Sequence, residues 1–163
     1  MLILAKTMGE IHFRRLMEVY EDSCRENGEE FWPNETPERQ LALAEDGFYD
    51  YLTGSFFRTK GAVYAIWQAE GRYVSALRLE PYRDGLLLEA LETAPDRRQK
   101  GYAGKLIRSV LEQYNDMKIY SHVGKRNTAS LRTHETCGFR RILEHAVYID
   151  GSVNGRCCTL CHG

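Results

Sequence analysis

A short stretch of charged residues and glycines, DRRQKGYAGKL (residues 96–106), lies where an apolar run ends and a helix is expected to begin. The N-terminus of a helix leaves backbone N–H groups without partners and carries a partial positive charge, so it favours an anion. Gly101 and Gly104 remove side chains that would obstruct a phosphate, and Arg98 and Lys100 add positive charge. The stretch predicts a pyrophosphate site, and the alternative is an ordinary helix start with solvated arginines.

Two common nucleotide-binding loops do not fit this stretch. Its glycines are separated by two residues instead of the four of a nucleoside-triphosphate loop, and no Ser or Thr follows Lys105. The G-x-G-x-x-G pattern of dinucleotide-binding proteins is also missing.

Two glutamates, Glu89 and Glu92, precede the loop in the apolar run GLLLEALET. Burial raises the pKa of a carboxyl group toward neutrality, where the carboxylate can act as a general base. Because side chains alternate along a strand, we expect the two to point to opposite faces, with Glu89 on the face of Leu91 and Thr93. The alternative for each glutamate is an ion pair with Arg78 or Arg83 of the neighbouring strand.

The elements that would position these residues follow from hydrophobic periodicity and turn residues. We expect a strand at 2–8, helices at 10–27 and at about 41–57, a hairpin at 61–80, a strand at 85–93, a helix at 101–114, a strand at 117–123, a helix at 127–137 and two strands at 139–150 and 155–162. A meander followed by strand, helix, strand, helix predicts an α/β protein of the α+β type, with helices packed against a mixed sheet. The length of 163 residues fits one domain over 1–163.

Composition narrows the classes of partner. The 22 basic and 23 acidic residues give a formal charge of −1, which provides no electrostatic footprint for nucleic acid or acidic membranes. The opening MLILAKTM resembles neither a signal peptide nor a membrane span, so we expect a cytoplasmic protein. The five cysteines are an odd number and are expected to be reduced, and the ending RCCTLCHG is expected to be a strand without a metal.

With these features together, the sequence resembles the GNAT superfamily of N-acetyltransferases. The phosphate-binding motif of that family is Arg or Gln, two residues, Gly, one residue, then Gly or Ala, which Arg98, Gly101 and Ala103 match. The segment NTASLRTHETCGF (127–139) resembles the family's Asn-initiated helix ending in Gly-Phe. The resemblance covers residues 60–163 and implies a mostly antiparallel central sheet of about seven strands flanked by four helices.

The resemblance also implies a co-substrate, acetyl-CoA, and the residues that bind it. Its pyrophosphate would meet the backbone amides of Gln99, Lys100, Gly101, Tyr102, Ala103 and Gly104, beside Arg98. Leu91 and Thr93 would pair with the pantetheine arm as a peptide pairs with a strand edge. Asn127 and Ser130 share a helix face that would border the cofactor; their alternative roles are a helix cap and a solvated hydroxyl.

Catalytic roles follow from the same resemblance. An alkyl amine is mostly protonated at neutral pH and needs a base, and Glu89 is preferred because its face looks toward the acceptor in this family. His134 occupies the position where many members have a Tyr that acts as acid, and the alternative is a packed ring. An acceptor pocket would draw on aromatic residues, each of which is otherwise a core residue: Phe48, Tyr49, Tyr51, Phe56, Phe57, Trp67 and Tyr148.

The function predicted is therefore direct transfer of acetyl from acetyl-CoA to a primary amine, either a small molecule or a peptide. The alternative is a module of the same fold that binds acyl-CoA without catalysis. The sequence leaves open the acceptor, whether Glu89, Glu92 or water is the base, whether His134 acts as the acid, and the oligomeric state, with a homodimer as one option.

Overall fold

The computed structural model describes residues 1–163 and contains five α-helices and nine strands. The helices are α1 (Phe13–Val19), α2 (Glu21–Phe31), α3 (Pro37–Gly54), α4 (Tyr102–Gln113) and α5 (Thr128–Thr136), with 3-10 turns at Met8–Glu10, Phe56–Arg58 and Pro95–Arg97. The strands are β1 (Leu2–Ala5), β2 (Val63–Ala69), β3 (Arg72–Tyr82), β4 (Gly85–Thr93), β5 (Lys118–Gly124), β6 (Arg140–Leu143), β7 (Ala146–Val147), β8 (Val153–Asn154) and β9 (Cys157–His162).

Seven of these strands form one sheet in the order β1-β2-β3-β4-β5-β9-β6. Every neighbouring pair is antiparallel except β4 and β5, which are parallel. Helix α4 makes the crossover between these two parallel strands, as a parallel connection requires. The predicted mixed, mostly antiparallel sheet of seven strands is confirmed.

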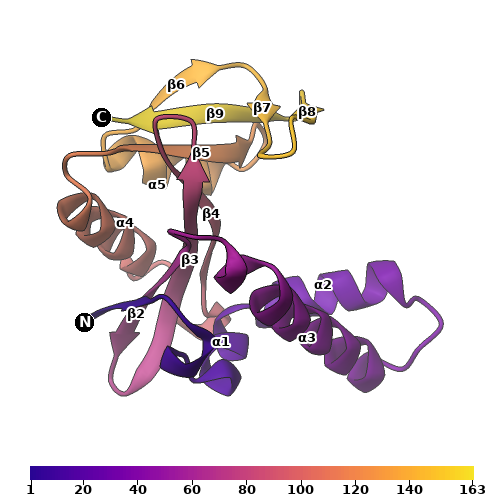
Figure 1. The fold of residues 1–163 in the computed structure, drawn as a ribbon. Helices are drawn as coiled ribbons and strands as arrows, with labels where there is room; N and C mark the ends of the chain where they lie inside the picture. Colours follow the sequence, from indigo (N-terminus) through magenta and orange to yellow (C-terminus); the bar gives the residue numbers. More distant parts are fainter.

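Five α-helices are present instead of about four, because the segment expected as one helix at 10–27 forms α1 and α2. The chain bends at Tyr20, which has φ −97° and ψ 18° and whose buried hydroxyl donates to the carbonyl of Ala90 on β4 at 2.7 Å. Helix α2 also continues past Gly28 instead of ending there. A Cβ on Gly28 would lie 2.7 Å from the carbonyl oxygen of Gln40, so this glycine permits close approach of α2 and α3, which form the pair extending from the sheet in Figure 1.

The C-terminal prediction of two long strands needs a second correction. Strand β6 pairs with β9 and ends at Leu143, and β7 then leaves the main sheet to pair with β8. Tyr148, expected on the penultimate strand, follows β7 in a turn. The bond from Thr159 Oγ1 to the carbonyl of His145 at 2.7 Å fixes the chain at this change of sheet.

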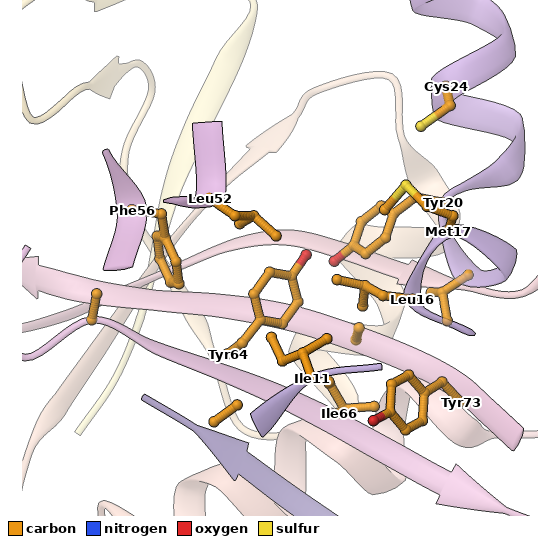
Figure 2. Close-up of a cluster of buried hydrophobic side chains, with 14 of the residues drawn as sticks. Ile11, Leu16, Met17, Tyr20, Cys24, Leu52, Phe56, Tyr64, Ile66 and Tyr73 are labelled. Atoms are coloured by element: carbon orange, nitrogen blue, oxygen red, sulfur yellow. The ribbon is translucent and has the colours of Figure 1, made fainter. Parts of the chain in front are cut away.

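Hydrophobic side chains cover both faces of the sheet. One cluster joins α1, α2 and α3 to the β2–β4 face, and Figure 2 shows the hydroxyl groups of Tyr20 and Tyr64 directed toward one another within it. A second cluster joins α4 and the segment between α5 and β6 to the opposite face and includes Leu106, Ile107 and Val110. Burial of each large apolar side chain stabilises the fold by about 1.5–3 kcal/mol, so the helices hold the central strands from both sides.

Candidate active site

A bulge in β4 sets the geometry of the candidate site. Arg78 of β3 lies opposite Glu89, but Ala76 lies opposite Glu92, so one residue of β3 faces two residues of β4. Ala90 has a positive φ of 51°, a conformation that non-glycine residues adopt rarely. Such a bulge interrupts the alternation of side chains along the strand.

The bulge brings both glutamates to the same face. Arg78 and Ala76 are two residues apart on β3 and therefore share a face, and residues directly opposite one another in an antiparallel pair also share a face. Ala76 packs in the cluster of α1, α2 and α3, whereas Leu91 packs against the cluster of α4. The expectation that Glu89 and Glu92 point to opposite faces, with Glu89 on the face of Leu91, is wrong because it assumed unbroken alternation.

Beyond the bulge, β4 separates from its parallel neighbour. Pairing of β4 with β5 ends where Leu88 faces Ser121, while β5 continues to pair with β9 as far as Gly124. Residues 89–93 therefore have no partner on the β5 side. The edge of β4 is open to an extended amide chain, which can add to a strand edge through main-chain hydrogen bonds.

The loop before α4 presents a row of free backbone donors. No protein acceptor receives a backbone hydrogen bond from the N–H groups of residues 98–104. Gln99 and Gly101 have φ values of 60° and 78°, and open space surrounds the Cα of Gly101. A loop with this alternation forms a concave array of N–H groups, and here it continues into the first turn of α4. This geometry fits the diphosphate predicted from the glycine-rich stretch.

Arg98 ties this loop to two other elements. Its guanidinium donates to Asp22 of α2 at 2.7 Å and to the carbonyl of Thr93 at 3.3 Å. Arg98 therefore connects the loop to both α2 and the end of β4.

A cavity of about 780 Å³ joins the open edge of β4, this loop and the start of α5. All the residues predicted to bind the cofactor line it except Lys100, namely Leu91, Thr93, Arg98, Gln99, Gly101, Tyr102, Ala103, Gly104, Asn127 and Ser130. Lys100 turns away, and its Nζ donates to the carbonyl of Asp96 at 3.4 Å. Asn127 caps α5 by accepting from the N–H of Ser130 at 3.1 Å.

A smaller cavity of about 410 Å³ lies between α2, α3 and the face of the sheet that packs against α1, α2 and α3. Of the aromatic residues predicted for an acceptor pocket, Phe48 and Tyr51 line it. Phe56 is fully buried in the core, Tyr49 is exposed, and Trp67 packs on the opposite face of the sheet. Phe57 packs against the core and Tyr148 stacks edge-on with His122, so neither lines this cavity.

Three of the aromatic residues that line the smaller cavity were missed from the sequence: Tyr20, Phe31 and Trp32. They lie at the two ends of α2, in segments where the sequence gives helix periodicity or a helix break and no functional signal. A signal that could have identified Phe31 and Trp32 is the occurrence of aromatic residues on both sides of the helix break that follows Trp32.

The two cavities share Ser23 and Glu92. The hydroxyl of Ser23 on α2 donates to Oε1 of Glu92, which leaves the second carboxylate oxygen free to accept a proton. Burial raises the pKa of Glu92 from 4.5 to about 7, against a lowering by Arg98, and the charges of Glu26 and Asp22 raise it further. Glu92 is therefore a carboxylate with a base-like pKa at the junction of two cavities.

Glu89 lies beside Glu80 and lines neither cavity. Burial raises the pKa of Glu89, and the neighbouring Glu80 carboxyl raises it further. Its Oε2 is buried without a hydrogen-bond partner. The pairing with Arg78 across the strands that the sequence offered as an alternative is present in register, without an ion pair within 4.0 Å.

His134 is 1% exposed and lies outside both cavities. Its Nε2 lies 2.9 Å from the hydroxyl of Ser121 and its Nδ1 lies 2.8 Å from the carbonyl of Ser130. Burial lowers its pKa, and its ring packs edge-on against Phe139. This geometry is that of a packed ring, and the acid role of His134 stays a prediction without a contact to support it.

The remaining reactive groups form no second centre. All five cysteines are free, and burial raises the pKa of Cys137, which contacts Arg108 at 3.8 Å instead of a base. No group of three or more His, Cys, Asp or Glu side chains is arranged to hold a metal ion. None of the helices combines the length and apolar character that a membrane-spanning segment needs.

An open strand edge beside an array of free N–H groups is the geometry of a protein that binds an extended amide chain joined to a diphosphate. Comparison with known families agrees, because residues 14–139 match the model of the acetyltransferase (GNAT) family. The chain belongs to this family. No sequence among the curated proteins gives a significant match.

Solved structures share the fold at low sequence identity. The PaiA N-acetyltransferase of Thermoplasma acidophilum, in complex with coenzyme A, has a TM-score of 0.62 at 12% identity, covering 99% of this chain and 98% of that one. The ribosomal-protein-S18-alanine N-acetyltransferase of Escherichia coli has a TM-score of 0.61 at 11% identity, covering 99% and 92%. The spermidine N-acetyltransferase of Vibrio cholerae, in complex with coenzyme A and spermine, has a TM-score of 0.56 at 19% identity, covering 99% and 94%.

Proposed function

We propose that this protein is an N-acetyltransferase that transfers acetyl from acetyl-CoA directly to a primary amine while both substrates are bound. The observation that carries the proposal is the junction of the two cavities at Glu92 and Ser23. One cavity fits an extended thioester cofactor and the other fits a small acceptor, and a carboxylate with a raised pKa lies where they meet.

In the larger cavity, this chain's own groups would bind and orient the cofactor. The free N–H groups of residues 98–104 would hold the diphosphate, and the open edge of β4 at Leu91 and Thr93 would pair with the pantetheine amides. Acetyl-CoA would supply an acetyl thioester beside the β4 bulge. Glu92 lines this cavity together with Leu91 and Thr93, so the thioester would lie beside Glu92.

In the smaller cavity, Glu92 would act as the general base. An amine of pKa about 10.4 is protonated at neutral pH, and the ionised Glu92 would take its proton, directly or through a water molecule. The amine nitrogen would then bond to the acetyl carbon as the carbon–sulfur bond breaks, and the departing thiolate would take the second proton of the nitrogen. A thiol of pKa about 8.5 is a tolerable leaving group as the thiolate, so the chemistry makes little demand on an acid. Ser23 would hold Glu92 in position.

The proposal names Glu92 as the base in place of the sequence-based preference for Glu89. Burial and the neighbouring Glu80 carboxyl raise the pKa of Glu89 against a lowering by Arg78, which favours its protonated form, and a protonated carboxyl group cannot accept a proton. Glu89 also lines neither cavity, whereas Glu92 lines both.

The test is turnover with a panel of amines, followed by the appearance of free thiol from acetyl-CoA and by mass spectrometry of the product. We expect thiol release that depends on both substrates. The product should be about 42 mass units heavier than the amine, because an acetyl group replaces a hydrogen. Calorimetric binding of acetyl-CoA without turnover of any amine or peptide would instead identify a non-catalytic acyl-CoA-binding protein. Lack of coenzyme A binding would overturn both readings.

A further inference from the structure

Arg78 is a positively charged residue in the smaller cavity with no polar partner in the chain. It is half-buried on β3, and its guanidinium carbon lies 4.8 Å from the ring centre of Tyr51 and 5.8 Å from that of Phe56. Its Nε is buried without a hydrogen-bond partner, and none of the ten ion pairs of the chain includes it. A guanidinium has five N–H donors in a planar fork that matches a carboxylate.

The neighbouring carboxyl groups do not satisfy these donors. Glu89 lies opposite Arg78 in the register but makes no hydrogen bond with it, and Glu89 Oε2 is itself without a partner. Glu80, two residues along β3, shares the face of Arg78 and is buried. Neither carboxyl group makes a hydrogen bond or an ion pair with Arg78, and unmade hydrogen bonds in a poorly solvated site favour a ligand that supplies them.

Arg78 and Glu92 stand at a separation that a small molecule can bridge. Glu92 lies opposite Ala76, and Arg78 is two residues further along the same strand, so the two positions are diagonal neighbours about 7–8 Å apart on one face. Both side chains line the same cavity. One small ligand can therefore place an amine at Glu92 and an anionic group at Arg78, provided that only a few bonds separate the two groups.

The rest of the cavity wall is largely aromatic. Tyr20, Phe31, Trp32 and Phe48 line it together with Tyr51, and its volume of about 410 Å³ lies within the range of small-molecule sites. An apolar substituent would occupy this part of the cavity, because aromatic walls favour apolar or aromatic groups.

We propose that the acceptor is an α-amino acid with an apolar or aromatic side chain, whose carboxylate pairs with Arg78 while its amine meets Glu92. This inference rests on the proposed function and narrows the acceptor to one chemical class. It also disfavours a polyamine, because a second ammonium group placed beyond the reacting amine would approach the Arg78 guanidinium.

The test compares three acceptors that share an amine and a phenyl ring: L-phenylalanine, its neutral carboxamide and phenethylamine, with spermidine as a polyamine control. We expect kcat/KM for L-phenylalanine to exceed those for the carboxamide and phenethylamine by roughly 10- to 100-fold, the usual effect of a charge-assisted bidentate pair. In Arg78→Met, the preference should disappear through loss of the L-phenylalanine activity alone.

The matched control is Arg83→Met, since Arg83 also stacks on an aromatic ring, that of Tyr82 at 5.3 Å, but lines neither cavity. This variant should keep the wild-type preference. Folding of Arg78→Met is checked by calorimetric binding of coenzyme A, and if that variant does not fold, the comparison of the three acceptors on the wild-type protein decides. Equal or better use of phenethylamine or spermidine would overturn the inference and leave the acetyltransferase proposal intact, whereas no thiol release with any amine would count against the proposed function itself.

Discussion

Replacing Glu92 by Gln tests the reasoning about the junction of the two cavities most directly. The substitution keeps the size of the side chain and its bond with Ser23 but removes the ability to accept a proton. A positioned general base contributes about 10²- to 10⁴-fold to a rate. We therefore expect kcat/KM at pH 8 to fall by that factor, with acetyl-CoA bound within a few-fold of the wild-type dissociation constant.

The pH dependence of kcat/KM provides a second, independent test of Glu92 as the base. With a pKa of about 7 for Glu92, the ionised fraction falls about tenfold for each pH unit well below neutrality. The wild-type kcat/KM should show an acid limb with an apparent pKa near 7, and Glu92→Gln should lack it. Initial rates of thiol release between pH 5.5 and 9 measure both.

Ser23 provides a finer perturbation of the same group. Its hydroxyl donates to the Glu92 carboxylate and so stabilises the ionised form. A hydrogen bond to a charged group contributes about 1.5–3 kcal/mol, and 1.36 kcal/mol corresponds to one pKa unit. Since the pair is half-buried, we expect Ser23→Ala to move the acid limb upward by about one unit, and Ser23→Thr to restore it.

Glu89→Gln is the control for these experiments, because Glu89 also has a raised pKa but lines neither cavity. It should keep the acid limb and most of the rate. Full activity of Glu92→Gln, or loss of the acid limb in Glu89→Gln alone, would refute the assignment of the base.

Three further predictions concern the loop, the helix α5 and the pH dependence of stability. Gly101→Val should weaken coenzyme A binding at least tenfold, because its φ of 78° disfavours a β-branched residue and the side chain would occupy the open space where the diphosphate is proposed to bind. The control is Gly71→Val in the β2–β3 turn, where φ is 73° and the surroundings are equally open; it should lose similar stability but keep the affinity measured by calorimetry. His134→Phe should lower the free energy of unfolding by about 1–3 kcal/mol in urea titrations, because Ser121 loses a buried partner. The same variant should change kcat less than tenfold, and a larger loss of kcat at unchanged coenzyme A affinity would restore the acid role. The pKa of Glu92 is raised in the folded state, so between pH 4.5 and 7 the folded protein holds more protons than the unfolded chain. The contribution of Glu92 to stability should therefore be full below pH 4.5 and decline as the pH rises to about 7, and this decline should be absent from the stability profile of Glu92→Gln.

The sequence by itself determined the features whose signals are local. The loop proposed to bind the diphosphate is visible because Arg98, Gly101 and Gly104 are close in the chain and lie where a strand gives way to a helix, so the free N–H groups of the first turn of α4 follow from helix geometry. The same holds for Asn127, whose capping of α5 depends on residues three positions apart. The alternation of helices and strands also implied the mixed sheet.

Only the tertiary structure decided which carboxylate meets both cavities. The bulge at Ala90 arises from the pairing of β4 with β3, and a one-residue insertion of this kind reverses the face of every side chain beyond it. Ser23 reaches Glu92 across 69 positions of the chain, so no spacing rule could have linked them. The burial of His134 and the free guanidinium of Arg78 likewise depend on packing between distant elements, because the partners of a side chain are set by the fold and not by its neighbours in sequence.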